Sequence, residues 1–300
     1  MLLAPSTSPS LSITSRHPTV DPSRYEGLLA DVQRLRGRVY TGDGAIPISE
    51  LDCEGRHFME NDRESWHLLL LQEQNTVDGC IRLFVDRPPT TFDHLQIRHS
   101  ALTQSREWGH RVRGAIENEI REARTCKFSY VEIGGWALSS SVRGTTAALM
   151  CLAATYAWAQ LVGGCIGICT ATTRHRSASI LCRTGGSPLE FDGIRLPAYY
   201  DPAYGCQMEM LRFDSRAAAP KFLPIVDDMK QRLLSVPIVG TTNRPLVDQS
   251  LLDNVFHQNL TAYNLSTPPP AAGATHAWPM GYRPNWQTAL AWRTTNRRRL

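Results

Sequence analysis

One stretch near the middle of the chain, residues 128–161, constrains the fold more than any other. It begins with an apolar run rich in β-forming residues, FSYVEIGGWAL, and continues through SSSVRGTTAA into a nearly uncharged run that ends at Leu161. This order of residue types favours a strand and a helix joined by a tight turn of small residues. We therefore expect a strand over 128–138 and a helix over 144–161.

The predicted turn has the properties of an anion-binding site. The first turn of a helix has four backbone N–H groups without intrahelical acceptors, at the positive end of the helix dipole. Small residues at 144–148 would let an anion approach those groups closely, and a preceding arginine would add a charged donor. The pattern predicts a pyrophosphate cradle made by Arg143, Gly144, Thr145, Thr146, Ala147 and Ala148.

Hydrophobic periodicity predicts one α/β domain over residues 22–235. Amphipathic helices are expected from Pro22 to Gly42 and over 108–123, a β-hairpin over 66–86, and further strands over 164–172 and 206–214. Short helices are expected near His175 and over 224–235. Strands interspersed with helices in this order predict a mixed sheet with helices on both faces.

The two ends of the chain differ in composition from this domain. Residues 1–21 have no basic start and no continuous apolar stretch, so we expect a disordered leader rather than a secretory signal. Residues 236–300 are rich in Pro, Thr, Asn and Ala, and we expect a largely disordered tail. That tail holds the excess of arginines behind the formal net charge of +4, which argues against a nucleic-acid-binding core.

Composition also limits the environment of the chain. With 42% hydrophobic residues among 300, the chain can bury a sizeable core, yet no run reaches the roughly 20 apolar residues needed to span a bilayer. The eight cysteines are scattered within apolar patterns, so we expect buried, reduced thiols in a cytoplasmic protein. Neither a disulfide framework nor a metal site is expected.

The strand–turn–helix unit resembles the acyl-donor motif of the GNAT superfamily of acyltransferases, usually written Arg-Gly-x-Gly-x-Gly/Ala. Arg143-Gly144 begin the motif, Thr146 stands where the middle glycine is expected, and Ala148 fills the last small position. The resemblance implies a GNAT-like, mostly antiparallel mixed sheet with a splay near its middle strand. It also implies that the backbone of Trp136, Ala137 and Leu138 binds the pantetheine arm of the donor.

Shorter motifs resemble two groups within that superfamily, the acyl-homoserine-lactone (autoinducer) synthases and the long-chain N-acyl amino acid synthases. The resemblance covers roughly residues 25–215 in element order, and its motifs are LRGRVY (35–40), Glu50-Leu51-Asp52, Arg82 in GCIRLF and Glu132 in VEIGGWAL. The lactone synthases have a tryptophan after the first helix where this chain has GDGAIP. That difference favours a plain amino acid as the acceptor.

The resemblance implies an N-acyltransferase that moves a long-chain acyl group to the amine of an amino acid or similar small acceptor. The donor would be a thioester of an acyl carrier protein or of CoA, acting as a co-substrate with no bound cofactor. A carrier protein could dock on arginines near the donor site, although these could equally be solvated surface residues: Arg143, Arg174, Arg176 and Arg183. A short-chain CoA-dependent acetyltransferase and a non-catalytic sensing module of the same fold remain open.

Three charged residues are candidates for the acceptor side. Glu132 could take a proton from the attacking ammonium, or it could be a strand residue in an ion pair with Arg82 or Arg36. Arg82 and Arg36 could bind the acceptor's carboxylate, or they could be an ion-paired core arginine and a solvated helix arginine. The pair Gly134-Gly135 next to Glu132 predicts a bulge or a splay.

Three further residues are expected to have no catalytic role. Asp52 and Asp62 could order their loop by pairing with arginines or could be simple loop acids, and we expect the second. Many GNAT enzymes carry a tyrosine general acid at the position that Cys182 takes here, and we expect Cys182 to be a packing residue. The apolar runs 67–71, 147–161 and 165–169 could line an acyl tunnel or simply form the core.

Overall fold

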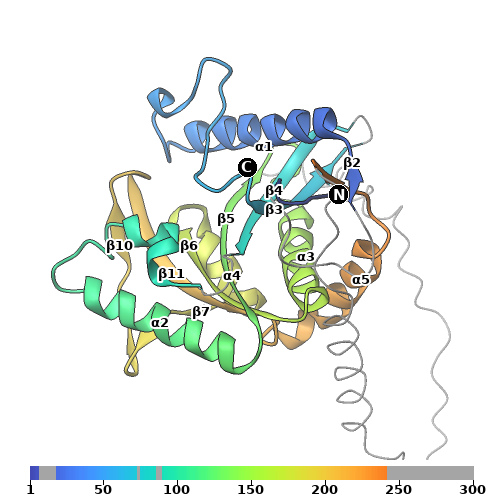
Figure 1. The fold of residues 1–300 in the computed structure, drawn as a ribbon. Coiled ribbons are helices and arrows are strands. Elements are labelled where there is room, and N and C mark those ends of the chain that lie inside the picture. The colour runs from blue at the N-terminus through green and yellow to red at the C-terminus, as the bar shows by residue number, and fades with distance from the viewer. Residues whose placement is uncertain (7–17, 73–74, 86–89, 242–300) are drawn as a thin grey trace, which may run out of the picture. The chain divides into compact units, whose positions relative to one another are not determined.

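The computed structural model describes residues 1–6, 18–72, 75–85 and 90–241 (Figure 1). The helices are α1 (Pro22–Gly42), α2 (Gly109–Thr125), α3 (Ala147–Leu161), α4 (Ser177–Thr184) and α5 (Leu223–Leu233). The longer strands are β3 (Ser65–Leu71), β4 (Val77–Val85), β5 (Ser129–Leu138), β6 (Cys165–Thr172) and β11 (Cys206–Asp214). The short strands are β1 (Leu2–Leu3), β2 (Thr19–Val20), β7 (Ser187–Pro188), β8 (Glu190–Phe191), β9 (Ile194–Arg195), β10 (Tyr199–Asp201) and β12 (Ile238–Gly240).

One large sheet organises these elements. Its strand order is β10-β11-β6-β5-β4-β3-β1-β12-β2, and β7 also pairs with β11. Neighbouring strands are antiparallel except for β5 with β6, β1 with β12 and β12 with β2, which are parallel. The mixed, mostly antiparallel sheet predicted from the sequence is thus confirmed, as are the β3–β4 hairpin and the strands at 164–172 and 206–214.

Helix α1 forms where its local signals predict it. The Asp21 side chain accepts a hydrogen bond from the Arg24 N–H at 2.9 Å, and Pro22 occupies the first turn. One face of α1 is buried, because its apolar residues recur at helical spacing: Tyr25, Leu28, Leu29, Val32 and Leu35. These residues pack against β4 and β5, which places the end of α1 beside the middle of the sheet.

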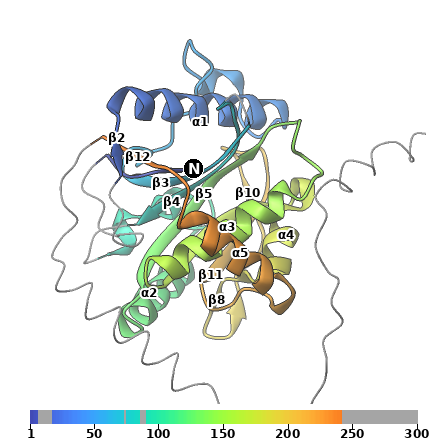
Figure 2. The ribbon, with the colours of Figure 1, turned by 90° about the vertical axis from the view of Figure 1, so that its right-hand side faces the viewer.

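Helices cover both faces of the sheet, as predicted. Helices α1 and α2 pack on one face, whereas α3 packs on the other and lies side by side with α5 (Figure 2). Helix α3 is nearly uncharged because both of its sides are buried, one by β3 and β4 and the other by α5. Trp158 is completely buried, and its ring lies 6.3 Å from that of Trp66 on β3.

The expected domain boundaries at residues 22 and 235 differ from the structure at both ends. Leu2 and Leu3 are fully buried in β1, which pairs with β3 on one side and with β12 on the other. The sheet therefore takes in residues expected to be a disordered leader and residues expected to be tail. Two-residue strands have no periodicity that a sequence could reveal. Residues 7–17 and 242–300 lie outside the described residues.

Two helix starts also differ from expectation. Helix α3 begins at Ala147, three residues after the predicted start at Gly144, and α4 begins at Ser177 rather than near His175. His175 and Arg176 have left-handed backbone conformations, with φ of 59° and 61°, which keeps them out of the helix.

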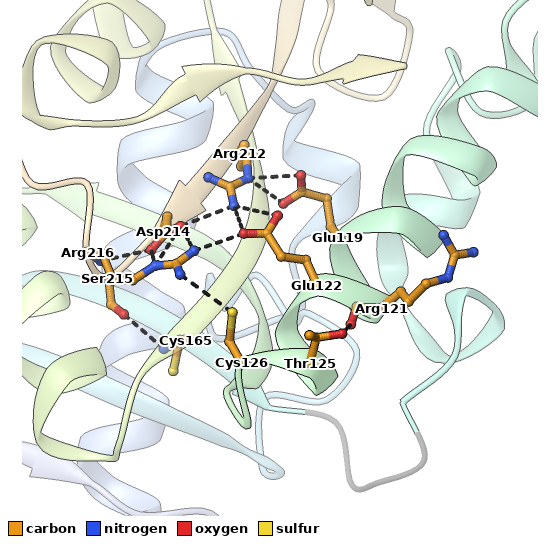
Figure 3. Close-up of polar contacts among 10 residues, drawn as sticks. All are labelled: Glu119, Arg121, Glu122, Thr125, Cys126, Cys165, Arg212, Asp214, Ser215 and Arg216. Carbon is orange, nitrogen blue, oxygen red and sulfur yellow. Dashed lines mark hydrogen bonds and ion pairs between the residues drawn. The ribbon is translucent and has the colours of Figure 1, made fainter. Parts of the chain in front are cut away.

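An ion-pair network fastens α2 to the end of β11 (Figure 3). The Arg212 guanidinium bonds Glu119 at 2.8 Å and Glu122 at 3.0 Å, and it lies 3.1 Å from Asp214. Arg216 bonds Asp214 and Glu122 in turn, at 2.6 and 2.9 Å. The network fixes the face opposite α3 and contributes no residue to the cavity described below.

Candidate active site between strands β5 and β6

The sheet opens between its only two long parallel neighbours in the described part of the chain, β5 and β6. Their pairing runs from Ser129 with Cys165 to Ile133 with Cys169 and then stops. Beyond that point β5 continues to Leu138 along β4, and β6 continues to Thr172 along β11. The two strands therefore separate, which confirms the predicted splay and leaves the β6-facing edge of β5 without a strand partner.

A bulge in β5 lies at the start of this opening. The register with β4 shifts between Cys80 and Arg82, and Gly135 has a φ of 62°. A Cβ atom at position 135 would lie 3.1 Å from Arg82 Cβ and 3.2 Å from Arg36 Nη1, so both the backbone conformation and the crowding require glycine. The bulge predicted from the glycine pair is confirmed.

A cavity of about 370 Å³ occupies the opening. Its wall on the α1 side includes Tyr40 and Met59, and Tyr204 comes from the turn between β10 and β11. Its wall on the α3 and α4 side is apolar and includes Leu152 and Leu181. The predicted donor-binding residues Trp136, Ala137, Leu138, Arg143, Gly144 and Ala148 all line it. The cavity thus passes through the sheet from one face to the other.

The predicted anion cradle lies at the rim of this cavity. Gly144 has a φ of 72°, and a side chain there would meet no atom within 4 Å. The Thr145 hydroxyl, one residue before the N-cap Thr146, accepts a hydrogen bond from the Ala147 N–H at 3.1 Å. Among the described residues, the N–H groups of Gly144, Thr146, Ala148 and Leu149 have no acceptor. Gly144 and Ala148, whose amides are free, line the cavity, whereas Thr145, Thr146 and Ala147 do not.

The Arg143 side chain does not project freely over the cradle. Its Nη1 and Nη2 bond the two carboxylate oxygens of Asp43 at 2.7 and 2.6 Å, and its Nε donates to the Leu138 carbonyl at 3.1 Å. The Arg143 hydrogen bonds hold the pKa of Asp43 below its usual range, so the carboxylate stays charged. Asp43 is therefore part of the site, although no sequence motif includes it.

Arg36 is neither a solvated helix arginine nor a free acceptor clamp. It is fully buried, and its guanidinium forms a bidentate pair with Asp62 while donating to the His57 carbonyl. Asp62 also accepts from Gln33 Nε2 and the Met59 N–H, each at 3.1 Å. Burial raises the pKa of Asp62, but the Arg36 bonds and charge outweigh it and bring that pKa to about 2. The expectation that Asp62 is a simple loop acid is wrong, because it anchors the loop after α1.

Asp52, expected with Asp62 to be a loop acid, is also paired. It bonds Arg56 Nε at 2.7 Å and accepts from the Glu54 and Arg56 N–H groups. Both acids thus order the segment that follows α1.

Arg82 is buried with an incomplete set of partners. Its side chain is 1% exposed, its Nη1 donates to the Glu60 carbonyl at 2.7 Å, and its Nε has no partner among the described residues. Burial lowers the pKa of this guanidinium, and the charge of Glu132 opposes that effect. A buried guanidinium with unused hydrogen-bond donors is expected where an anionic ligand binds.

Glu132 lies on the same face of the sheet as Arg82. Arg82 pairs with Gly134 across the strands and Phe84 pairs with Glu132, so the two charged residues are diagonal neighbours. Glu132 accepts a hydrogen bond from the Gln96 N–H at 2.8 Å, and burial raises its pKa while Arg82 lowers it. Neither Glu132 nor Arg82 lines the cavity, but Gly134 between them does.

Two tyrosines complete the polar part of the cavity. The Tyr40 hydroxyl donates to the Trp136 carbonyl at 3.4 Å, which ties α1 to β5. Tyr204 lines the cavity near Arg82, and burial raises the pKa of its hydroxyl. Tyr40 ends the LRGRVY motif noted in the sequence, whereas nothing there marked Tyr204, which follows the short strand β10. Cys182 is partly buried on α4 and does not line the cavity.

The arginines expected to receive a carrier protein fall into two groups. Arg143 and Arg174 make intramolecular bonds, the latter donating to the carbonyls of Asp43, Gly44 and Gly205. Arg176 and Arg183 are exposed.

Within the described residues, no cluster of His, Cys, Asp or Glu is placed to hold a metal ion. Every helix in the same part of the chain is too short or too polar to cross a bilayer.

Comparison with known proteins returned similarities to solved structures. The chain matches the CoA-dependent acyl-homoserine lactone synthase BjaI, solved with SAM and isopentyl-CoA, at 16% identity and a TM-score of 0.46, over 81% of this chain and 96% of that one. It matches FeeM, an N-acyl amino acid synthase from uncultured soil microbes, at 12% identity and a TM-score of 0.41, over 66% and 88%.

A third similarity is to a putative N-acetyltransferase from Lactobacillus plantarum, at 15% identity and a TM-score of 0.36, over 63% of this chain and 91% of that one. No family model and no curated protein sequence matches the chain.

Proposed function

We propose that this protein is an N-acyltransferase that moves an acyl group from a thioester donor to the amine of an amino acid or similar small acceptor. The observation that carries the proposal is the cavity at the β5–β6 opening, which has unpaired helix amides at one rim and a buried, partly unpaired arginine beside its wall. An extended donor and a small charged acceptor could meet there at the bulge of β5.

The donor would bind along the free edge of β5. Its phosphate would lie at the amides around Gly144, and its pantetheine arm would pair with the backbone of residues 136–138, which has no strand partner on that side. Backbone N–H groups near Gly134–Ala137 would then face the thioester carbonyl and stabilise the oxyanion that develops on it. The carbonyl carbon would thus be held next to the acceptor side of the sheet.

The acceptor would bind on the face covered by α1 and α2. Arg82 has an unpaired Nε to offer a carboxylate, and Gly134, which lines the cavity next to it, has no side chain to cover it. Glu132 would accept the proton of the ammonium as the amine attacks, directly or through water. Arg36 is committed to Asp62, so its role would be to hold α1 and the following loop in place.

The reaction would need no covalent enzyme intermediate. The amine nitrogen forms the new amide bond, the carbon–sulfur bond breaks, and the thiol of the donor leaves with a proton from solvent. Holding both substrates in one cavity would supply much of the rate enhancement. The apolar wall formed by α3, α4 and β6 supports a long acyl chain over an acetyl group, since an acetyl group would leave most of that wall uncovered.

Lipid extracts from cells that overproduce the protein provide the test. Mass spectrometry should find an N-acylated amino acid that is absent from cells producing Glu132→Gln, and the mass should identify donor and acceptor together. In vitro, Glu132→Gln should lower turnover about 100-fold or more at neutral pH. The loss of turnover should be smaller above the pKa of the acceptor's amine, because the amine is then already deprotonated in solution. Absence of any N-acyl product across donors from acetyl to long-chain would overturn the proposal.

A further inference from the structure

The ion pair between Asp43 and Arg143 lies at the mouth of the cavity. Asp43 caps the end of α1, Arg143 precedes the amides of the cradle, and both side chains line the cavity. The two residues are 100 positions apart in sequence, yet both guanidinium nitrogens Nη1 and Nη2 bond the carboxylate, at 2.7 and 2.6 Å. The cation nearest the predicted phosphate position is therefore already neutralised by a carboxylate of the protein itself.

Hydrogen bonds from Arg174 hold the backbone at Asp43 in place. Arg174 Nη1 donates to the Asp43 carbonyl at 2.7 Å and to the Gly44 carbonyl at 3.1 Å, while its Nη2 donates to the Gly205 carbonyl at 3.0 Å. These bonds join the end of α1 to the β10–β11 turn. The Asp43 carboxylate is 20% exposed, so its neighbours cover most of it.

A donor phosphate at the cradle would meet two opposing charges. The free amides, Arg143 and Arg174 attract it, whereas the Asp43 carboxylate beside Arg143 repels it. At separations of a few ångström and a surface-like dielectric, a like charge on the donor weakens its binding about tenfold. The penalty grows with the number of negative charges that the donor brings to this point.

We propose that Asp43 is a specificity-determining residue for the donor and that it selects against donors with several phosphate charges at the cradle. This inference rests on the proposed function. Free CoA carries a pyrophosphate and a ribose phosphate, whereas a phosphopantetheine arm attached to a protein carries one phosphodiester. Asp43 therefore lowers the affinity for CoA more than that for a singly charged pantetheine donor.

The test compares CoA with uncharged pantetheine as ligands, measured by isothermal titration calorimetry on the full chain. Asp43→Asn should bind CoA about 10-fold more tightly than the wild type at low salt, and the gain should shrink at high salt. Its affinity for pantetheine should be unchanged. Asp93→Asn is the matched control, since it breaks an exposed Asp–Arg pair with Arg113 and should leave CoA binding at the wild-type value.

A double-variant cycle shows whether Asp43 acts through Arg143. If it does, Asp43→Asn should give less than about a twofold gain when Arg143→Gln is also present. Equal or weaker CoA binding by Asp43→Asn would overturn the inference, because Asp43 would then orient Arg143 for the donor rather than oppose it. That result alongside measurable acyl transfer leaves the proposed function standing, whereas no binding of CoA or pantetheine by any variant would overturn both.

Discussion

Arg82 on β4 and Gly134 on β5 are direct cross-strand partners, and a side chain at position 134 would begin 3.6 Å from Arg82 Nη2. Because residue 134 is glycine, nothing on β5 covers the guanidinium at this point, and Gly134 itself lines the cavity. On β5, only the backbone of Gly134 therefore lies between the Arg82 guanidinium and the cavity.

Replacing Arg82 with Met should separate activity from stability. A buried guanidinium with one carbonyl acceptor among the described residues is costly to the fold, so Met of similar length should raise the free energy of unfolding by about 1–3 kcal/mol. Acyl transfer should meanwhile fall about 30-fold or more in kcat/KM for the acceptor, with the KM for the donor unchanged. Urea unfolding and steady-state kinetics measure the two effects. Loss of stability together with activity would mean that Arg82 only supports the fold.

The buried pair of Arg36 and Asp62 makes a prediction about stability alone. Asp62→Ala leaves the Arg36 guanidinium, which is 0% exposed, without its carboxylate and should cost about 3–5 kcal/mol. Arg36→Met combined with Asp62→Leu should recover most of that loss. Asp93→Ala removes an exposed partner of Arg113 and should cost no more than about 1 kcal/mol. Equal losses for Asp62→Ala and Asp93→Ala would contradict the buried pairing.

The bulge in β5 can be tested with two glycine substitutions. Gly135→Ala places a Cβ on a backbone with a φ of 62° and within 3.2 Å of two arginine side chains, so it should destabilise the protein by about 2 kcal/mol or more. Gly27→Ala on α1 meets nothing within 4 Å and should stabilise the helix by about 0.5–1 kcal/mol. Thermal unfolding of both variants measures these two changes in stability. A neutral Gly135→Ala would show that the bulge is absent.

His67 on β3 should make the protein sensitive to acid. It is fully buried, its Nε2 lies 2.7 Å from the Asp62 carbonyl, and burial lowers its pKa to about 4. The unfolded chain binds a proton at this histidine near pH 6.5, so stability should fall by about 3 kcal/mol as the pH drops from 6.5 to 4. His67→Gln should flatten that slope in urea unfolding, and exposed His110→Gln should not. An unchanged slope in His67→Gln would contradict a neutral buried ring.

The sequence was informative wherever a signal was local. The strand at 129–138, the apolar helix after it and the glycine bulge could each be predicted, because residue pattern and glycine geometry act within a few positions. The sheet class followed from the order of such elements. Predictions failed where one residue depends on another far along the chain, as with Arg36, whose partner Asp62 lies on the loop after α1.

The composition of the site was less predictable than its location. Asp43 reaches Arg143 across 100 residues, and no local pattern distinguishes it from any other acid at a helix end. Tyr204 enters the cavity from a turn next to a strand of three residues, too short to show an alternating pattern. The short strands β1 and β12 were missed for the same reason.

The most direct test of the account is a crystal structure of the protein with a thioether analogue of a long-chain acyl-CoA, which cannot be cleaved. We expect density for the pantetheine arm between β5 and β6, with its phosphate at the amides around Gly144 and its acyl chain against Leu152 and Leu181. An analogue bound elsewhere on the chain, with the opening between the two strands empty, would contradict it.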